Sequence, residues 1–286
     1  MHQLEQLPDL AADARRVAQT ALLEDGDRDL TTQVTFASAG TAVATGVLEC
    51  RERVVVAGVR YADAVAGLAQ ATITWKVEEG QAVDRGPLGE IRGSLAAVLR
   101  AERPLLNLLQ RATGIATLTR RYVDALAGTL CRVLHTRKTT PGLRLFDVAA
   151  VVAGGGSVHR LDLAHTVMVK DNHWAALQAT GRSLAEALDD ARALGVVSCQ
   201  VEVESEAALR EACAAGANRL LIDNQNPSTV QAWGTLARSL RPGITIEATG
   251  GVTLENARLF AEAGADFVSV GELTHSVRAA NIALEL

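Results

Sequence analysis

The sequence predicts an α/β protein in which a small antiparallel sheet with one or two helices precedes a closed or nearly closed α/β barrel. In residues 131–273, short β-branched runs alternate with helical stretches over short connections, which is typical of a parallel sheet. So many alternations in series favour a barrel. Residues 41–99 instead alternate apolar and polar side chains between Gly and Pro turns, which is typical of antiparallel strands.

One helix is predicted over residues 102–128, between the two parts. Pro104 suits its first turn, where a missing N–H loses no hydrogen bond. An apolar stripe at helical spacing supports the helix and consists of Leu105, Leu108, Leu109, Ala112, Ile115, Ala116 and Thr119. With Pro104 as the first helical position, Arg103 stands at the very start of the helix, where its side chain could project from the end. An ordinary exposed arginine is the other interpretation.

The barrel strands are expected in six runs with helices between most of them. The runs are residues 131–138, 166–173, 199–205, 219–224, 244–251 and 267–273. The helices are expected at residues 174–194, 206–217, 227–240 and 253–265. Polar residues gather at or near the carboxyl ends of these runs, the end of an α/β barrel that carries active sites. They are Arg137, Lys138, Lys170, Asp171, Glu202, Glu204, Asp223, Asn224, Glu247 and Thr249.

Lysine is rare in this chain, which has 28 Lys and Arg residues in total. It occurs only at Lys76, Lys138 and Lys170. Lysine offers a compact ammonium on a flexible stem, whereas arginine offers a planar fork. A chain that uses arginine almost everywhere keeps lysine where the chemistry needs it, so Lys138 and Lys170 are candidate site residues. Lys76 resembles a surface residue at a strand edge and is given no role.

Composition excludes several classes of function. A formal net charge of -5 and 3% aromatic residues argue against nucleic-acid binding, which needs positive surfaces and stacking platforms. The four cysteines are scattered without a CxxC pair, which indicates reduced thiols and a cytoplasmic location. No apolar run is long enough to span a bilayer and no leader pattern opens the chain, so no membrane partner is expected.

Three groups of residues carry the predicted chemistry. A cationic set suits an anionic substrate and comprises Arg137, Lys138, His159, Arg160 and Lys170, with three glycines preceding His159. Glu202, Glu204 and Asp223 could hold magnesium or ribose hydroxyls, or form internal ion pairs. Gly250 and Gly251 could open a helix and expose N–H groups to a phosphate. Together they suit a phosphorylated sugar diphosphate held with magnesium beside a polyanionic second substrate.

These motifs, in this order, resemble the quinolinate phosphoribosyltransferase family. The matching stretches are ERPLLNLLQRATGIAT, TRKTTPGLR, GGGSVHR, VKDNH, VEVES, LLIDN, EATGG and VGELTHS, with EDGDRDLTT near the N-terminus. The resemblance implies an N-terminal α/β sandwich over residues 1–107 and an incomplete, TIM-like α/β barrel over residues 108–274. Residues 275–286 would pack back on the sandwich. It also implies a homodimer and, as activity, phosphoribosyl transfer from phosphoribosyl pyrophosphate to quinolinate with decarboxylation, in NAD biosynthesis.

The resemblance also implies residue roles. Quinolinate would be bound by Arg103, Arg137, His159, Arg160 and Lys170, with Arg103 donated by the partner subunit. Lys138, Glu202 and Asp223 would be catalytic and would bind the phosphoribosyl substrate, the two carboxylates partly through Mg²⁺. The cradle for the 5′-phosphate would consist of Thr249, Gly250, Gly251 and Gly271. Asp171 and His173 share the lysine motif without an assigned role.

The sequence departs from the family pattern at three places. Val158 replaces an asparagine before His159, no Glu-Lys-Tyr block precedes the three glycines, and Thr249 replaces a common serine. The first two lie near the dicarboxylate site and leave open a paralogue with another acceptor, such as the molybdenum-transport-associated one. That paralogue lacks the lysine motif at Lys170. The residues also leave open a Schiff-base aldolase that uses Lys170, and a binding protein without catalytic activity.

Overall fold

The computed structural model describes residues 4, 7–36 and 41–286. The chain folds into two compact units, each assembled from separate segments. The first unit comprises residues 1–120, 138–156 and 272–286, and the second comprises residues 121–137 and 157–271. Along the described chain, no helix has both the length and the apolar character needed to cross a membrane.

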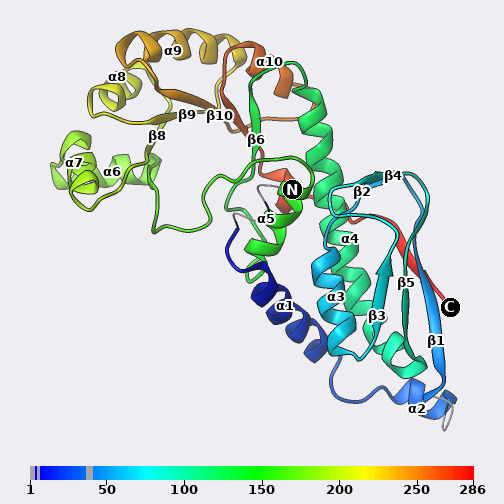
Figure 1. Cartoon of the computed structure of the whole chain (residues 1–286). Helices are drawn as coiled ribbons and strands as arrows, with labels where there is room; N and C mark the ends of the chain where they lie inside the picture. The colour runs from blue at the N-terminus through cyan, green and yellow to red at the C-terminus, as the bar shows by residue number, and fades with distance from the viewer. Residues whose placement is uncertain (1–3, 5–6, 37–40) are drawn as a thin grey trace. The chain divides into compact units, whose positions relative to one another are not determined.

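The first unit is built on a four-stranded antiparallel sheet with helices (Figure 1). The strand order is β12-β1-β5-β3, and β2 and β4 form a separate two-stranded ribbon. The strands are β1 (Val43–Cys50), β2 (Val54–Val55), β3 (Thr72–Trp75), β4 (Ala82–Val83), β5 (Gly86–Ser94) and β12 (Ile282–Glu285). The helices are α1 (Leu10–Glu24), α2 (Leu30–Phe36), α3 (Val59–Leu68), α4 (Leu95–Ala125), α5 (Arg144–Ala153) and α11 (Glu272–His275), and α4 continues into the second unit.

Apolar alternation explains this sheet. Along β1, burial alternates in its second half, where Leu48 and Cys50 are fully buried. Tyr61 links three helices, because its ring meets Phe146 of α5 edge-on at 4.8 Å and its hydroxyl donates to Asp13 of α1. The expected antiparallel sheet with helices is thus confirmed, and the last strand of the chain supplies one of its edges.

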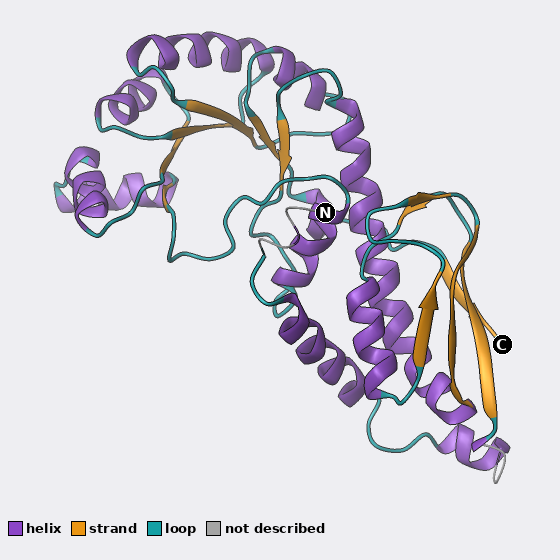
Figure 2. Cartoon of the chain, in the orientation of Figure 1, coloured by secondary structure: helices purple, strands orange, loops and turns teal. Residues whose placement is uncertain are grey.

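The second unit is a six-stranded parallel sheet with helices against it (Figure 2). The strand order is β6-β11-β10-β9-β8-β7. The strands are β6 (Arg132–Leu134), β7 (Val167–Val169), β8 (Cys199–Val203), β9 (Arg219–Asp223), β10 (Thr245–Thr249) and β11 (Phe267–Ser269). The helices are α6 (Asp171–Thr180), α7 (Leu184–Ala193), α8 (Glu206–Ala214), α9 (Pro227–Leu240) and α10 (Ala257–Glu262). Among the described strands β6 and β7 are the two ends of the order, as in an incomplete α/β barrel.

The prediction for the linking helix was wrong about its beginning. Helix α4 begins at Leu95, so Pro104 lies inside it and Arg103 projects from its side. The Ser94 hydroxyl accepts a hydrogen bond from the Ala97 amide and satisfies one of the free N–H groups of the first turn. Sequence reasoning placed the start at the proline, the commoner position for that residue.

Two barrel helices also differ from expectation. The single helix expected over residues 174–194 is two helices, because Gly181 adopts a left-handed conformation with φ of 67° and ends α6. Ser183 then caps α7. The helix expected from Thr253 begins at Ala257, after a turn in which the Asn256 side chain accepts from the Thr253 amide and donates to the Gly251 carbonyl.

Candidate active site

The predicted polar residues of the second unit lie along one edge of its sheet. All paired strands are parallel, so their carboxyl ends share that edge. At or just after these ends stand Arg137, Lys170, Glu202, Asp223, Thr249, Gly250, Gly251 and Gly271. A parallel bridge between Leu134 and Ser157 adds the segment that carries His159 and Arg160.

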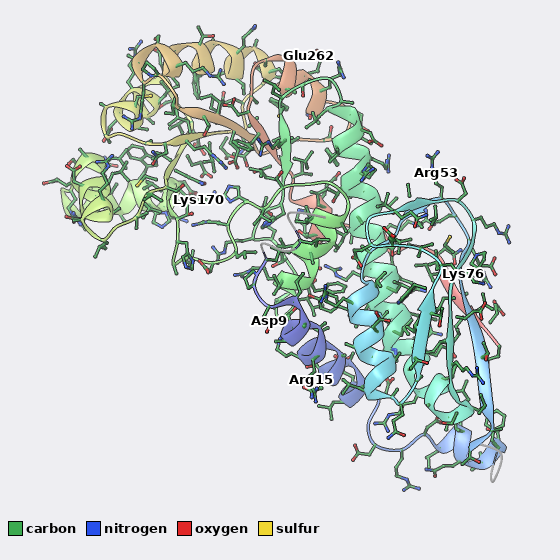
Figure 3. All side chains as sticks on the ribbon, in the orientation of Figure 1. Asp9, Arg15, Arg53, Lys76, Lys170 and Glu262 are labelled. Atoms are coloured by element: carbon green, nitrogen blue, oxygen red, sulfur yellow. The ribbon has the colours of Figure 1, made fainter. Side chains whose placement is uncertain are left out.

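Lys170 and Glu202 form an ion pair across the neighbouring strands β7 and β8. Glu202 is buried, whereas the Lys170 side chain is 40% exposed at the start of α6 (Figure 3). The Lys170 amide donates to Nδ1 of His173, and the indole of Trp174 donates to the Glu202 carbonyl. The lysine motif therefore fixes its backbone at a helix start and leaves the ammonium at the carboxyl edge. Glu204 is exposed beyond β8 and does not share the setting of Glu202.

His159 is held by a buried carboxylate that sequence reasoning gave no role. Its Nε2 lies 3.2 Å from Oε2 of Glu247, and the side chains are 7% and 1% exposed. Arg219 donates to the same oxygen at 3.0 Å, and the Ser269 hydroxyl donates to the other oxygen. Burial alone would raise the pKa of Glu247, but the hydrogen bond and charge of His159, the hydrogen bond from Ser269 and the charge of Arg219 hold that pKa below its ordinary value.

His135 orients the backbone of the same segment. The His159 amide donates to Nε2 of His135 at 3.1 Å, so this nitrogen carries no proton. Nδ1 of His135 therefore carries the proton and donates to the Thr136 carbonyl at 3.0 Å. The buried imidazole is hydrogen-bonded through both ring nitrogens and fixes the backbone position of His159.

Arg160 and Arg137 are like charges near enough for one to affect the other. Burial lowers the pKa of the Arg160 guanidinium, and the charge of Arg137 lowers it further, while Glu247 opposes both effects. Two guanidinium groups within electrostatic range repel each other until an anion lies between them. The structure thus brings Arg137, His159 and Arg160 into one cationic group.

Asp223 and Gly250 lie against each other at the ends of β9 and β10. The Asn224 amide donates to the Thr249 carbonyl, and the Asn224 side chain donates to Asp223 at 2.6 Å. A Cβ atom on Gly250 would lie 2.3 Å from Oδ1 of Asn224 and 2.8 Å from Asp223, and its φ is 72°. Only glycine fits there. The carboxylate of Asp223 therefore adjoins the Gly250–Gly251 turn.

That glycine turn does not open a helix directly. Both glycines have positive φ, of 72° and 62°, but α10 begins only at Ala257. The expectation of a helix N-terminus behind the turn was wrong, because the Asn256 side chain holds an intervening turn.

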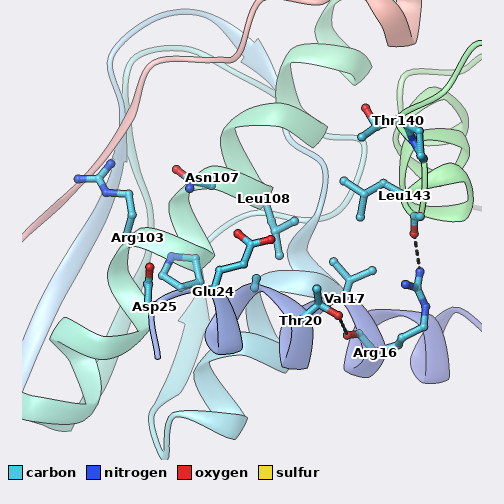
Figure 4. Close-up of a pocket in the computed structure, with 14 residues that line it drawn as sticks. Arg16, Val17, Thr20, Glu24, Asp25, Arg103, Asn107, Leu108, Thr140 and Leu143 are labelled. Atoms are coloured by element: carbon cyan, nitrogen blue, oxygen red, sulfur yellow. Dashed lines mark hydrogen bonds between the residues drawn. The ribbon is translucent and has the colours of Figure 1, made fainter. Parts of the chain in front are cut away.

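Arg103 and Lys138 belong to the first unit. Arg103 is exposed on α4, where its guanidinium lies 3.7 Å from Glu102, and it lines a cavity of about 340 Å³ (Figure 4). Arg16 reaches the other end of this cavity and donates to the Gly142 carbonyl. Lys138 follows Arg137 in the chain, its side chain is exposed, and its carbonyl accepts a hydrogen bond from the Thr274 hydroxyl at 2.8 Å.

The fit for a divalent cation rests on Glu202 and Asp223. No group of three or more His, Cys, Asp or Glu side chains suited to a metal occurs among the described residues. Mg²⁺ keeps several waters and is commonly held by one or two carboxylates together with substrate phosphates. Two carboxylates on adjacent strands, one beside the glycine turn, fit that mode.

Comparison with known proteins agrees with this arrangement. The family models for the N-terminal and C-terminal domains of quinolinate phosphoribosyl transferase match residues 29–113 and 115–285. The chain belongs to the quinolinate phosphoribosyl transferase family. The resemblance seen in the sequence is therefore confirmed, and so is the fold class.

Relatives of this family align along most of the chain. It is 41% identical to the nicotinate-nucleotide pyrophosphorylase (carboxylating) of Mycobacterium leprae, over 96% of this chain and 97% of that protein. The human protein of the same name is 35% identical over 81% and 78%. Among solved structures, the nicotinate-nucleotide pyrophosphorylase from Francisella tularensis superposes with a TM-score of 0.87 at 29% identity, covering 97% of both chains. NadC from Streptococcus pyogenes gives 0.85 at 35% identity over 95% of both.

Proposed function

We propose that this chain transfers the phosphoribosyl group of phosphoribosyl pyrophosphate to quinolinate, with release of pyrophosphate and carbon dioxide. The product would be nicotinate mononucleotide, a precursor in NAD biosynthesis. The family supports this activity, since its members in Mycobacterium leprae and human are named nicotinate-nucleotide pyrophosphorylases (carboxylating). The observation that carries the proposal is the group of cationic side chains at the carboxyl edge, where buried Glu247 holds His159 at 3.2 Å and Arg160 follows His159 in the chain.

Quinolinate fits this cationic group by its charge. It has two adjacent carboxylates, which would relieve the repulsion between Arg137 and Arg160. His159, held by Glu247, would contact the substrate on one side. Lys170 would reach the substrate from the carboxyl end of β7. Arginine forks bind carboxylates bidentately, which would set the orientation of the ring.

The reaction then follows from charge. The lone pair of the pyridine nitrogen attacks C1′ of the ribose as the bond from C1′ to the pyrophosphate oxygen breaks. Ribosylation makes the ring nitrogen cationic, so the bond to the adjacent carboxylate can break with its electron pair left on the ring carbon. Carbon dioxide leaves and a proton takes its place. Fixed charges around such a centre usually supply the largest catalytic contribution.

The carboxylates would serve the sugar. Glu202 and Asp223 would bind ribose hydroxyls and stabilise the positive charge that develops on the ring. Thr249, Gly250, Gly251 and Gly271 would receive the 5′-phosphate, consistent with the contact of Asp223 with Gly250. Mg²⁺, held by Glu202 and Asp223 partly through the substrate, would neutralise charge on the departing pyrophosphate.

Lys138 would bind the pyrophosphate side, and Arg103 would act across a homodimer interface. Both belong to the first unit, and both side chains are exposed. As the family resemblance implies, Arg103 would be donated to the quinolinate site of the partner subunit.

Pyrophosphate release tests this function. We expect release with phosphoribosyl pyrophosphate, magnesium and quinolinate, accompanied by carbon dioxide, and none with nicotinate as acceptor. Lys138→Ala should lower kcat by about 100-fold or more, because one charge at the leaving group is removed.

Lys76→Ala is the matched control. Lys76 is a half-exposed lysine that binds Glu90 at 2.7 Å in the first unit (Figure 3), so its loss should leave activity unchanged. A folded wild type that releases pyrophosphate with neither acceptor would refute the proposed function. Release with another pyridine acid would indicate a paralogue, with Val158 the first position to examine.

A further inference from the structure

An ion pair in the first unit, between part-buried Arg111 and fully buried Asp147, is connected to the backbone at Lys138 and just after it. Asp147 of α5 is fully buried and accepts two hydrogen bonds from Arg111 of α4, from Nε to Oδ1 and from Nη2 to Oδ2, each at 3.0 Å. Removing two charges from water is costly, and apolar residues of similar size are often as stable. Because stability alone does not explain this ion pair, its other contacts indicate its role.

Its remaining hydrogen bonds go to the loop after Lys138 and to α11. Arg111 donates to the Thr140 hydroxyl at 2.8 Å and to the Thr274 carbonyl at 3.0 Å. Asp147 also accepts from the Thr140 amide at 3.1 Å. Thr274 is 1% exposed, and its hydroxyl donates to the Lys138 carbonyl at 2.8 Å.

These contacts fix the main chain at Lys138. Its own carbonyl is bound by Thr274, and the residue two positions later is bound by both partners of the ion pair. The lysine side chain itself is exposed on a flexible four-carbon stem. A fixed main chain limits the positions that the Lys138 ammonium can reach. A misplacement of about 1 Å of a reacting or binding group can lower a rate by about 100-fold.

We propose that Arg111, Asp147 and Thr274 are positioning residues that hold Lys138 for the pyrophosphate group. This inference rests on the proposed function, which assigns Lys138 to pyrophosphate. It also explains why the segment 139–147 combines threonines with a buried aspartate, which the substrate roles alone leave unexplained.

The test compares Thr274→Val with Thr274→Ser. Valine keeps the shape of threonine and removes the donor to Lys138, whereas serine keeps the hydroxyl. We expect Thr274→Val to raise the KM for phosphoribosyl pyrophosphate and the Kd for magnesium pyrophosphate by about three- to ten-fold, the range of one hydrogen bond. The KM for quinolinate should stay unchanged, and Thr274→Ser should restore wild-type values.

Thr119→Val is the matched control. Thr119 is also fully buried, and its hydroxyl also donates to a backbone carbonyl at 2.8 Å, that of Ile115, with no bond to the Lys138 loop. It should change neither constant. If Thr274→Val does not fold, Thr140→Val removes the acceptor for Arg111 and should show the same selectivity.

Calorimetric binding of magnesium pyrophosphate separates the two proposals. A wild type that binds pyrophosphate but does not turn over quinolinate would refute the proposed function, and the binding constants of the variants would still decide the positioning role. Equal constants in wild type and Thr274→Val would overturn the inference. So would equal weakening for quinolinate and pyrophosphate, the same loss in Thr119→Val, or no binding of pyrophosphate by the wild type.

Discussion

Glu247 shows how one buried carboxylate organises several cationic residues. It contacts His159, Arg219 and Ser269 at once, and its charge also bears on Arg160. Arg219 is placed further by the Phe267 ring, 4.0 Å from its guanidinium carbon. One buried carboxylate thus opposes the positive charge of the arginines around it and places His159.

Replacement of this carboxylate should destabilise the fold. We expect Glu247→Gln to lower the free energy of unfolding by about 3–5 kcal/mol, because Arg219 loses a buried partner. Glu90→Gln, which breaks a half-exposed ion pair with Lys76, should change it by less than about 1 kcal/mol. Urea denaturation at pH 7 measures both, and equal effects of the two variants would contradict the role of Glu247.

The same variant should change the acid sensitivity. The folded-state pKa of Glu247 lies below its ordinary value of 4.5, so its stabilisation is complete above about pH 4.5 and is lost as pH falls through the folded-state value. Unfolding free energies of the wild type should therefore decline more steeply below pH 4.5 than those of Glu247→Gln.

Gly250 and Gly251 allow the steric cost of an added Cβ atom to be separated from the cost of a positive φ angle. Both have positive φ, but only Gly250 has no room for a Cβ atom, while nothing lies within 4 Å of a Cβ on Gly251. Gly250→Ala should lower the free energy of unfolding by about 1–3 kcal/mol beyond the effect of Gly251→Ala, which has only the backbone penalty of about 1 kcal/mol. Thermal unfolding measures the difference, and equal losses would argue against the contact with Asn224.

At the scale of elements, local patterns predicted most of the structure. The runs at Cys199–Val203 and Arg219–Asp223 are strands, because short β-branched segments between helical segments suit a parallel sheet. Every residue of the first run is buried, although Gln200 and Glu202 interrupt its apolar residues. The errors concerned boundaries. Gly181 and Asn256 end or delay helices through a left-handed turn and a side-chain hydrogen bond, which apolar periodicity does not record.

The candidate site was less predictable from the sequence than the sheet. Charged residues at strand ends followed from the strand pattern, but the pairing of Lys170 with Glu202 and the buried group around Glu247 depend on which strands are neighbours. Glu247 did carry a signal, since it is a carboxylate inside an apolar strand. A buried charge needs a partner, although the sequence could not identify it. The domain boundary at residue 107, inside α4, stays a prediction.

The edge strand β12 gives a prediction at the element scale. Ile282 is 2% exposed, and its carbonyl accepts from the Gln110 side chain at 2.6 Å. Ile282→Ala should lower the free energy of unfolding by about 2–5 kcal/mol, because it removes buried methyl groups. Leu286→Ala, at a position 66% exposed, should change it by less than about 0.5 kcal/mol. Equal midpoints in urea for the two variants would show that β12 adds no stability.

At the scale of the whole molecule, the two compact units do not correspond to two consecutive stretches of sequence. The first unit draws on three separate segments and the second on two. The chain passes from the second unit to the first between Arg137 and Lys138, neighbours to which the proposal gives different substrates. A helix–strand pattern cannot reveal such interleaving, because it describes each element without its long-range partners.

The pairing of β12 with β1 also has a consequence for synthesis on the ribosome. Leu48 and Glu49 are paired with Leu284 and Ala283, more than two hundred positions later in translation. Until Ala283 and Leu284 leave the exit tunnel, one edge of β1 lacks its β12 partner in the nascent polypeptide. Exposed strand edges are templates for association with other chains. This edge of β1 therefore stays open to such association until β12 has been synthesised.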